Sequence, residues 1–104
     1  MKHSKLFIFA IMTTLAVSGC KHQAATYPTD TLTTKNGSQL TITFFKHASL
    51  AIETEGRHIY IDPISQYADY ASLPKADLIL ITHSHYDHLD SAAVAALSTA
   101  ATTA

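Results

Sequence analysis

The feature that most constrains this chain is an apolar run followed at once by a dense cluster of histidine and aspartate. Residues 78–81 read Leu-Ile-Leu-Ile. A run without alternation is typical of a strand that is covered on both faces. Thr82 closes the run, and residues 83–88 then read His-Ser-His-Tyr-Asp-His. The cluster therefore sits at the carboxyl end of a buried strand, a rigid edge where sites in α/β folds commonly form.

The spacing of this cluster suits divalent metal ions. In extended backbone, side chains two residues apart point the same way, so His83 and His85 can converge on one ion. If the chain turns after His85, Asp87 and His88 face a neighbouring position. Imidazole nitrogen and carboxylate oxygen suit Zn²⁺ and similar ions, Mn²⁺ and Fe²⁺ among them. The alternative interpretation is a solvated polar loop at the end of a strand.

The residues before the cluster predict a small antiparallel sheet. Residues 40–45 alternate between apolar and polar side chains, as a half-buried strand does. Residues 50–54 and 57–62 alternate in the same way on either side of a Glu-Gly pair. This arrangement predicts a β-hairpin.

Further signals complete the predicted order of elements. Asp62-Pro63 ends the hairpin, because proline has no N–H for the ladder and restricts the residue before it. Residues 64–77 read as a loop with one helical turn. After the histidine cluster, Asp90 can cap a helix that begins at Ser91. The predicted fold class is therefore α/β, with mostly antiparallel strands followed by a loop and a helix.

The first 20 residues predict an export signal. A short basic stretch precedes the apolar residues 6–17, and small residues then lead to Cys20. This order is typical of a secretory signal peptide, and it resembles the lipobox of bacterial lipoproteins, whose Cys is lipidated. We expect a signal peptide over 1–19, a tether over 20–37 and a lipid anchor to a membrane of the bacterial cell envelope. An ordinary signal peptide with a chance Cys is the alternative.

The composition excludes several classes of protein. Seven Lys and Arg against eight Asp and Glu give a net charge of −1, without a basic stripe, so we expect no nucleic-acid partner. The single Cys excludes a disulfide framework and a Cys-based zinc finger. Seven His is many for 104 residues, which directs attention to histidine chemistry.

The chain resembles the metallo-β-lactamase-fold hydrolases. The likeness rests on residues 82–90, which read Thr-His-Ser-His-Tyr-Asp-His-Leu-Asp, and on Asp62-Pro63 after the preceding strand. Residues 45–49, Phe-Lys-His-Ala-Ser, are similar to the Gly-His-Ala-Ser segment of the subgroup that includes ascorbate-6-phosphate lactonase-like proteins, with Lys in place of the usual Gly. The resemblance implies that residues 38–104 are a partial domain, the N-terminal half of an αβ/βα sandwich.

The resemblance also implies roles for individual residues. His83 and His85 would bind a first metal ion, and Asp87 and His88 a second. Asp87 would also be the catalytic residue, oriented to handle the proton of the attacking water. Asp62 would be the structural acid beneath the site, holding the motif loop through hydrogen bonds.

His47 has two interpretations. It lies near the mouth of the site, or it is a buried, hydrogen-bonded histidine of the hairpin. The reaction that the resemblance implies is hydrolysis of a small-molecule ester, lactone, amide or phosphodiester by water that one or two ions, with Zn²⁺ first, activate.

The expected ligand set is incomplete in this sequence. After His88 there is no His or Cys, and Asp90 is the only acid. Because a catalytic zinc ion needs three protein ligands, we expect the chain to be an N-terminal fragment of such a protein. Three hypotheses follow: a truncated member of a metal-dependent hydrolase family, a membrane-tethered metal-binding module without turnover, and a fragment that does not fold stably.

Overall fold

The computed structural model describes residues 25–104. The predicted signal peptide and the lipidation site Cys20 therefore lie outside the described residues. Between residues 25 and 104, no helix is both long enough and apolar enough to cross a membrane.

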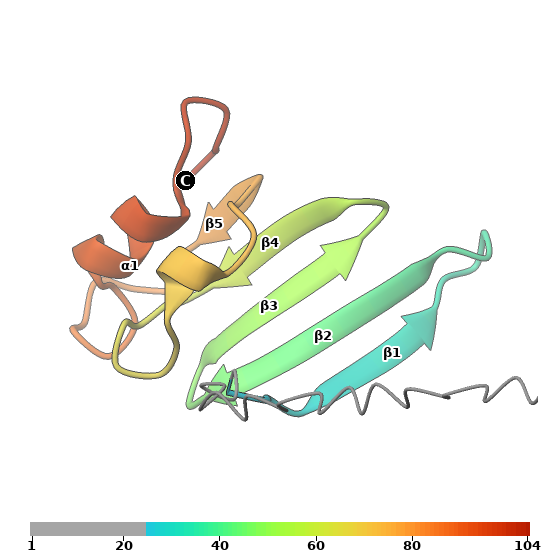
Figure 1. Ribbon diagram of the computed structural model, residues 1–104, viewed down its shortest axis with the longest axis horizontal. Helices are drawn as coiled ribbons and strands as arrows, with labels where there is room; N and C mark the ends of the chain where they lie inside the picture. The colour runs from blue at the N-terminus through green and yellow to red at the C-terminus, as the bar shows by residue number, and fades with distance from the viewer. Residues whose placement is uncertain (1–24) are drawn as a thin grey trace, which may run out of the picture.

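A five-stranded sheet is the frame of the molecule. Its strands are β1 Thr29–Thr33, β2 Gln39–Lys46, β3 Ser49–Thr54, β4 Arg57–Ile61 and β5 Leu78–Leu80, and its helices are the single 3-10 turn η1 Tyr70–Ser72 and α1 Ser91–Leu97. The strands lie in sequence order, and all neighbours are antiparallel except β4 and β5, which are parallel. Figure 1 shows α1 and the segment before β5 gathered at one end of this sheet.

The alternation of side chains predicted the central strands correctly. The structure confirms β2 and the hairpin of β3 and β4, whose turn is formed by Glu55 and Gly56. Both turn residues have positive φ, 50° and 73°, a conformation that glycine adopts without steric cost. The predicted loop with one helical turn is confirmed by η1, and the predicted helix by α1.

One face of the sheet, the covered face, carries the core. The register aligns Thr43, Ala51, Tyr60 and Ile79 in a row across β2 to β5. Tyr60 and Ile79 are 3% and 2% exposed, and they belong to one buried cluster with Tyr70 of η1 and Leu97 of α1. Burial of these side chains is the main force that holds η1 and α1 against the sheet.

The opposite face, the open face, is aliphatic but carries no helix of the described chain. Side chains alternate between faces, so the next row in the register points to this side. That row is Ile42, Ile52, Ile59 and Leu78. None of these residues belongs to the buried cluster or packs against it.

The open face bears on one expectation of the sequence analysis, the cover of residues 78–81. The run over residues 78–81 predicts a strand with cover on both faces, and a partial domain is expected to supply only part of that cover; the structure gives β5 over Leu78–Leu80. Ile79 is 2% exposed, whereas Leu80 on the open face is 46% exposed. Within the described residues, β5 is therefore covered on the core side only.

A second difference concerns the segment expected to be a tether over residues 20–37. Thr29–Thr33 form β1, which pairs with β2 in a regular antiparallel register. Tyr27 packs edge-on against Phe45, with ring centroids 4.8 Å apart. Every residue of β1 is exposed, so the strand has no alternation of buried and exposed side chains. It is held by backbone hydrogen bonds to β2, which a threonine-rich sequence does not predict.

Asp90 caps α1, as predicted. Its Oδ1 accepts hydrogen bonds from the backbone N–H groups of Ala92 and Ala93 at 2.9 and 3.3 Å. Its Oδ2 accepts another from the N–H of Ser65 at 2.8 Å. Asp90 therefore fixes both the start of the helix and the loop after β4.

Candidate metal centre

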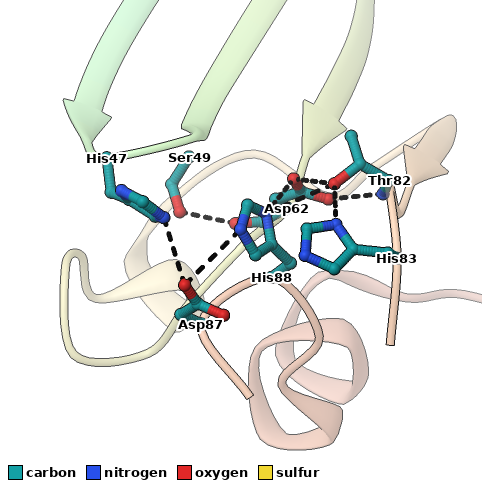
Figure 2. Close-up of polar contacts among 7 residues, drawn as sticks. All are labelled: His47, Ser49, Asp62, Thr82, His83, Asp87 and His88. Atoms are coloured by element: carbon teal, nitrogen blue, oxygen red, sulfur yellow. Dashed lines mark hydrogen bonds and ion pairs between the residues drawn. The ribbon is translucent and has the colours of Figure 1, made fainter. Parts of the chain in front are cut away.

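Strand direction brings distant parts of the sequence to one edge. Because β3 is antiparallel to both neighbours and β5 is parallel to β4, the strands β2, β4 and β5 run the same way. The residues that follow these strands meet at one end of the sheet: His47 after β2, Asp62 after β4, and residues 82–88 after β5. Figure 2 shows six of them, with Ser49 of β3, as one cluster.

Asp62 lies beneath this cluster and is fully buried. Its Oδ1 accepts a hydrogen bond from the backbone N–H of Thr82 at 2.7 Å, and its Oδ2 accepts one from the Thr82 hydroxyl at 2.6 Å. The same Oδ2 lies 2.7 Å from Nδ1 of His88, and the Ser49 hydroxyl donates to the Asp62 carbonyl. Asp62 therefore ties β3, β4 and the loop after β5 together.

The backbone of Asp62 is held in an unusual conformation. Its φ of 45° lies in the left-handed region, which is uncommon for a residue other than glycine. Such conformations persist where the surrounding structure determines them, and they concentrate at functional sites. Here the hydrogen bonds to both the carbonyl and the carboxylate supply that support.

The charge state of Asp62 sets the orientation of His88. Burial raises the pKa of Asp62, but hydrogen bonds from Thr82 and His88 lower it by more, so its pKa lies below the usual value. An ionised carboxylate only accepts hydrogen bonds, so Nδ1 of His88 carries the proton. The lone pair of Nε2 is then free to bind an ion.

The loop after β5 turns as predicted. The N–H groups of His88 and Leu89 both donate to the carbonyl of His85 at 2.9 Å. This turn brings Oδ2 of Asp87 to 3.5 Å from Nε2 of His88. The same oxygen lies 3.3 Å from Nε2 of His47, which reaches it from the turn between β2 and β3.

Two groups of side chains lie close enough to share an ion, each with its ligand atoms within 4.8 Å. The first group is His83, His85 and Asp87, and the second is His47, Asp87 and His88. The ring centroids of His83 and His85 are 4.7 Å apart, and those of His83 and His88 are 3.8 Å apart. The four predicted ligands therefore come together, with Asp87 common to both groups instead of belonging to one pair.

The donor set fits a divalent cation. Imidazole nitrogens with a carboxylate oxygen are the ligands that Zn²⁺ takes in proteins. Desolvation raises the pKa of Asp87, but its own backbone N–H and the neighbouring His88 and His47 lower it by more. The pKa of Asp87 is thus below its usual value, and the carboxylate is ionised at neutral pH.

Three placements were not settled by the sequence. His47 is half exposed and beside Asp87, at the edge of the cluster, not buried in the hairpin. Ser49 and Thr82 hold Asp62, and the sequence analysis gave neither a role at the site. No spacing marks these hydroxyl groups, because their partner Asp62 is 13 and 20 residues away in the sequence.

The chain matches a known family of domains and several named proteins. The family model described as the beta-lactamase superfamily domain matches residues 41–102, more than half of the chain. A UPF0173 metal-dependent hydrolase of Flavobacterium johnsoniae is 51% identical over 53 residues, which cover 46% of this chain and 24% of that protein. A protein of the same name from Bacillus pumilus is 41% identical over 51 residues, which cover 45% of this chain and 22% of that protein.

A solved structure is similar as well. The crystal structure of a protein from Parabacteroides distasonis, proposed to be a metal-dependent hydrolase, matches with a TM-score of 0.73 and 49% sequence identity. The match covers 74% of this chain and 35% of that one. The chain thus spans about a quarter of the length of the two curated relatives named above and about a third of the solved structure.

Proposed function

Because the chain belongs to the beta-lactamase superfamily domain family, we propose that it acts as a divalent-metal-dependent hydrolase. In this proposal the sheet is the N-terminal half of an αβ/βα sandwich, and the cluster at its edge holds one or two ions, with Zn²⁺ as the first candidate. The proposed ligands are His83, His85, Asp87 and His88. The observation that carries the proposal is the buried Asp62, whose carboxylate fixes the loop that bears all four.

The chemistry follows from the roles of these side chains. A bound divalent ion supplies Lewis acidity, which lowers the pKa of water to near 7 and polarises a carbonyl or phosphoryl oxygen. Asp87 is ionised, so its carboxylate can accept the proton of the attacking water. Asp62 keeps His88 in one tautomer and one orientation. The proposed substrates are small-molecule esters, lactones, amides or phosphodiesters.

Metal analysis of three proteins tests the ligand assignment. We expect the wild type to retain zinc after dialysis, and His85→Ala to lose the ion of its group, because an open two-ligand site is weak. His58→Ala is the matched control, since His58 lies in β4 at the end opposite the cluster. Equal metal content in all three proteins would contradict the assignment.

The same residues support a second candidate, a metal-binding module without turnover. Asp87 belongs to both candidate groups, so the two groups have only one carboxylate between them. Hydrolysis of a nitrophenyl ester and of bis-nitrophenyl phosphate, with and without a chelator, separates the candidates. Chelator-sensitive hydrolysis that His85→Ala abolishes favours the enzyme, whereas tight zinc binding without hydrolysis favours the module.

We also propose a location for the protein in the bacterial cell envelope. The support is the sequence alone: a basic start, the apolar residues 6–17 and the small residues before Cys20. A lipid on Cys20 would hold the domain at a membrane surface. Cys20→Ala is expected to move the protein out of the membrane fraction, and unchanged fractionation would remove the proposal.

A further inference from the structure

The turn between β2 and β3 aims His47 at the cluster. The register shifts between Phe44 and Lys46, and His47 follows with φ of 56°, in the left-handed region. Bulges of this kind re-aim side chains and are common next to active sites. The adjoining Ser49 is buried and donates to the Asp62 carbonyl, so the turn is fixed relative to the rest of the cluster.

The spacing around Asp87 matches that of ligands around one ion. Its Oδ2 lies 3.3 Å from Nε2 of His47 and 3.5 Å from Nε2 of His88. A charge-assisted N–H···O bond is shorter, at about 2.7–2.9 Å. Ligands that surround an ion tetrahedrally at about 2.0–2.1 Å lie about 3.3–3.4 Å from one another. Both distances therefore leave the room that a cation needs.

Two members of this group are positioned by hydrogen bonds that lead to the buried Asp62. His88 keeps 14% of its side chain exposed and is anchored by the buried Asp62. His47 is placed by a turn that Ser49 ties to the same Asp62. His83 and His85 are exposed, as His47 is, and Nδ1 of His83 lies 3.0 Å from the Thr82 hydroxyl. Pre-organised ligands lose less conformational freedom when an ion binds, which favours an ion at this group.

We propose that His47 is a metal ligand, which completes a three-residue site with Asp87 and His88. Among the described residues, 25–104, this site has three ligands, and catalytic zinc sites have three protein ligands and an open fourth position. The inference rests on the proposed function in one respect, namely that the cluster binds divalent ions at all. It differs from the sequence-based ligand set, in which Asp87 and His88 were two ligands without a third.

Titration of the full chain with Co²⁺ tests the proposal, because visible absorption of Co²⁺ reports the number and type of its ligands. The background variant is His83→Ala/His85→Ala, which removes the other group. We expect this background to bind one Co²⁺ with a spectrum typical of low coordination number. Adding His47→Gly should weaken Co²⁺ binding by about 100-fold. Removing a residue that only hydrogen-bonds to a ligand already weakens metal affinity by about 10- to 100-fold, and we expect loss of a ligand to reach the upper end of that range. Adding His58→Ala should leave it unchanged.

The outcomes separate this inference from the proposed function. If the wild type binds no Co²⁺, both fall. If the wild type binds but the background does not, or if His47→Gly leaves the affinity and spectrum of the background unchanged, the assignment of His47 is wrong while metal binding stands.

The choice of variant guards against a folding artefact. Glycine accepts the positive φ of this position, so His47→Gly removes the imidazole and keeps the turn. His47→Asn is the second variant, because asparagine also tolerates the left-handed region. Far-UV circular dichroism identifies any variant that fails to fold. If both variants keep the wild-type circular dichroism spectrum and the Co²⁺ affinity of the background, the proposal is overturned.

Discussion

The two faces of the sheet contain similar side chains but differ in what lies on them. On the covered face, Tyr60 and Ile79 are buried beneath η1 and α1. On the open face, Phe44 and Leu80 are 39% and 46% exposed, and no described helix packs there. Register alone cannot tell the faces apart, since both are rich in apolar residues. The faces differ because the segments after β4 and β5 pack against only one of them. The same two segments also carry Asp62 and residues 82–88 of the metal centre.

The largest effect on the free energy of unfolding is expected at a leucine beneath the covered face, compared with a leucine on the open face. Leu97 is 0% exposed beneath the covered face, so Leu97→Ala should lower the free energy of unfolding by about 2–5 kcal/mol. Leu80→Ala, on the open face, should lower it by less than about 1 kcal/mol. Urea unfolding followed by circular dichroism measures both. Equal losses would mean that the open face is as well packed as the covered one.

The next effect concerns the link between the covered face and the metal centre. Asp62→Asn keeps the shape of the buried side chain but removes its charge, so its hydrogen bonds with Thr82 and His88 weaken. We expect a loss of about 2–3 kcal/mol of unfolding free energy and a fall of about 10- to 100-fold in zinc affinity. Urea unfolding and zinc titration measure them. Asp30→Asn, in the exposed strand β1, is the matched control and should change neither.

A smaller effect tests the covered face through pH. Burial, with smaller contributions from Tyr70 and Glu53, raises the pKa of Tyr60 to about 12 from 10.0. As the pH rises, the unfolded chain therefore loses the Tyr60 proton before the folded chain does. The contribution of Tyr60 to the free energy of unfolding is fully present below pH 10 and is lost as the pH rises towards 12, by about 1.4 kcal/mol per pH unit.

Tyr60→Phe checks that assignment. It removes the hydrogen bond from the Tyr60 hydroxyl to the Pro74 carbonyl, at a cost of about 1 kcal/mol at neutral pH, and it should flatten the alkaline loss. Tyr86→Phe, at a side chain that is 90% exposed, should do neither. Urea unfolding at a series of pH values between 7 and 11 gives both results, and an unchanged alkaline slope in Tyr60→Phe would contradict the assignment.

The smallest effect is expected at the outer edge of the open face. Leu32 lies in β1 and is 55% exposed, so Leu32→Thr should change the unfolding free energy by no more than about 0.5 kcal/mol. Threonine also suits a strand, so β1 should persist in amide hydrogen exchange. A loss near that of Leu97→Ala would show that β1 packs against a further surface.

Local patterns predicted the parts of the fold that local physics decides. Alternation marked β2 to β4, the Glu55-Gly56 pair marked the hairpin, and Asp90 marked the start of α1. The sequence did not reveal β1, because its exposed threonines carry no pattern and its stability comes from pairing with β2.

The same limit applies to the candidate metal centre. The H-x-H-x-D-H spacing predicted that His83, His85, Asp87 and His88 would gather, and they do. It did not predict that His47 would join them, because residues 40 positions apart meet only through the common direction of β2 and β5. Strand direction is a property of the whole sheet, and no local pattern records it.

The side chain of Asp90 has a mechanical consequence. One of its oxygens holds the first turn of α1, and the other holds Ser65 in the loop after β4. Asp90 therefore connects this loop directly to the start of the helix. The helix begins at Ser91, three residues beyond His88. A displacement of the loop would therefore act on the start of α1 and on the adjoining segment that carries His88.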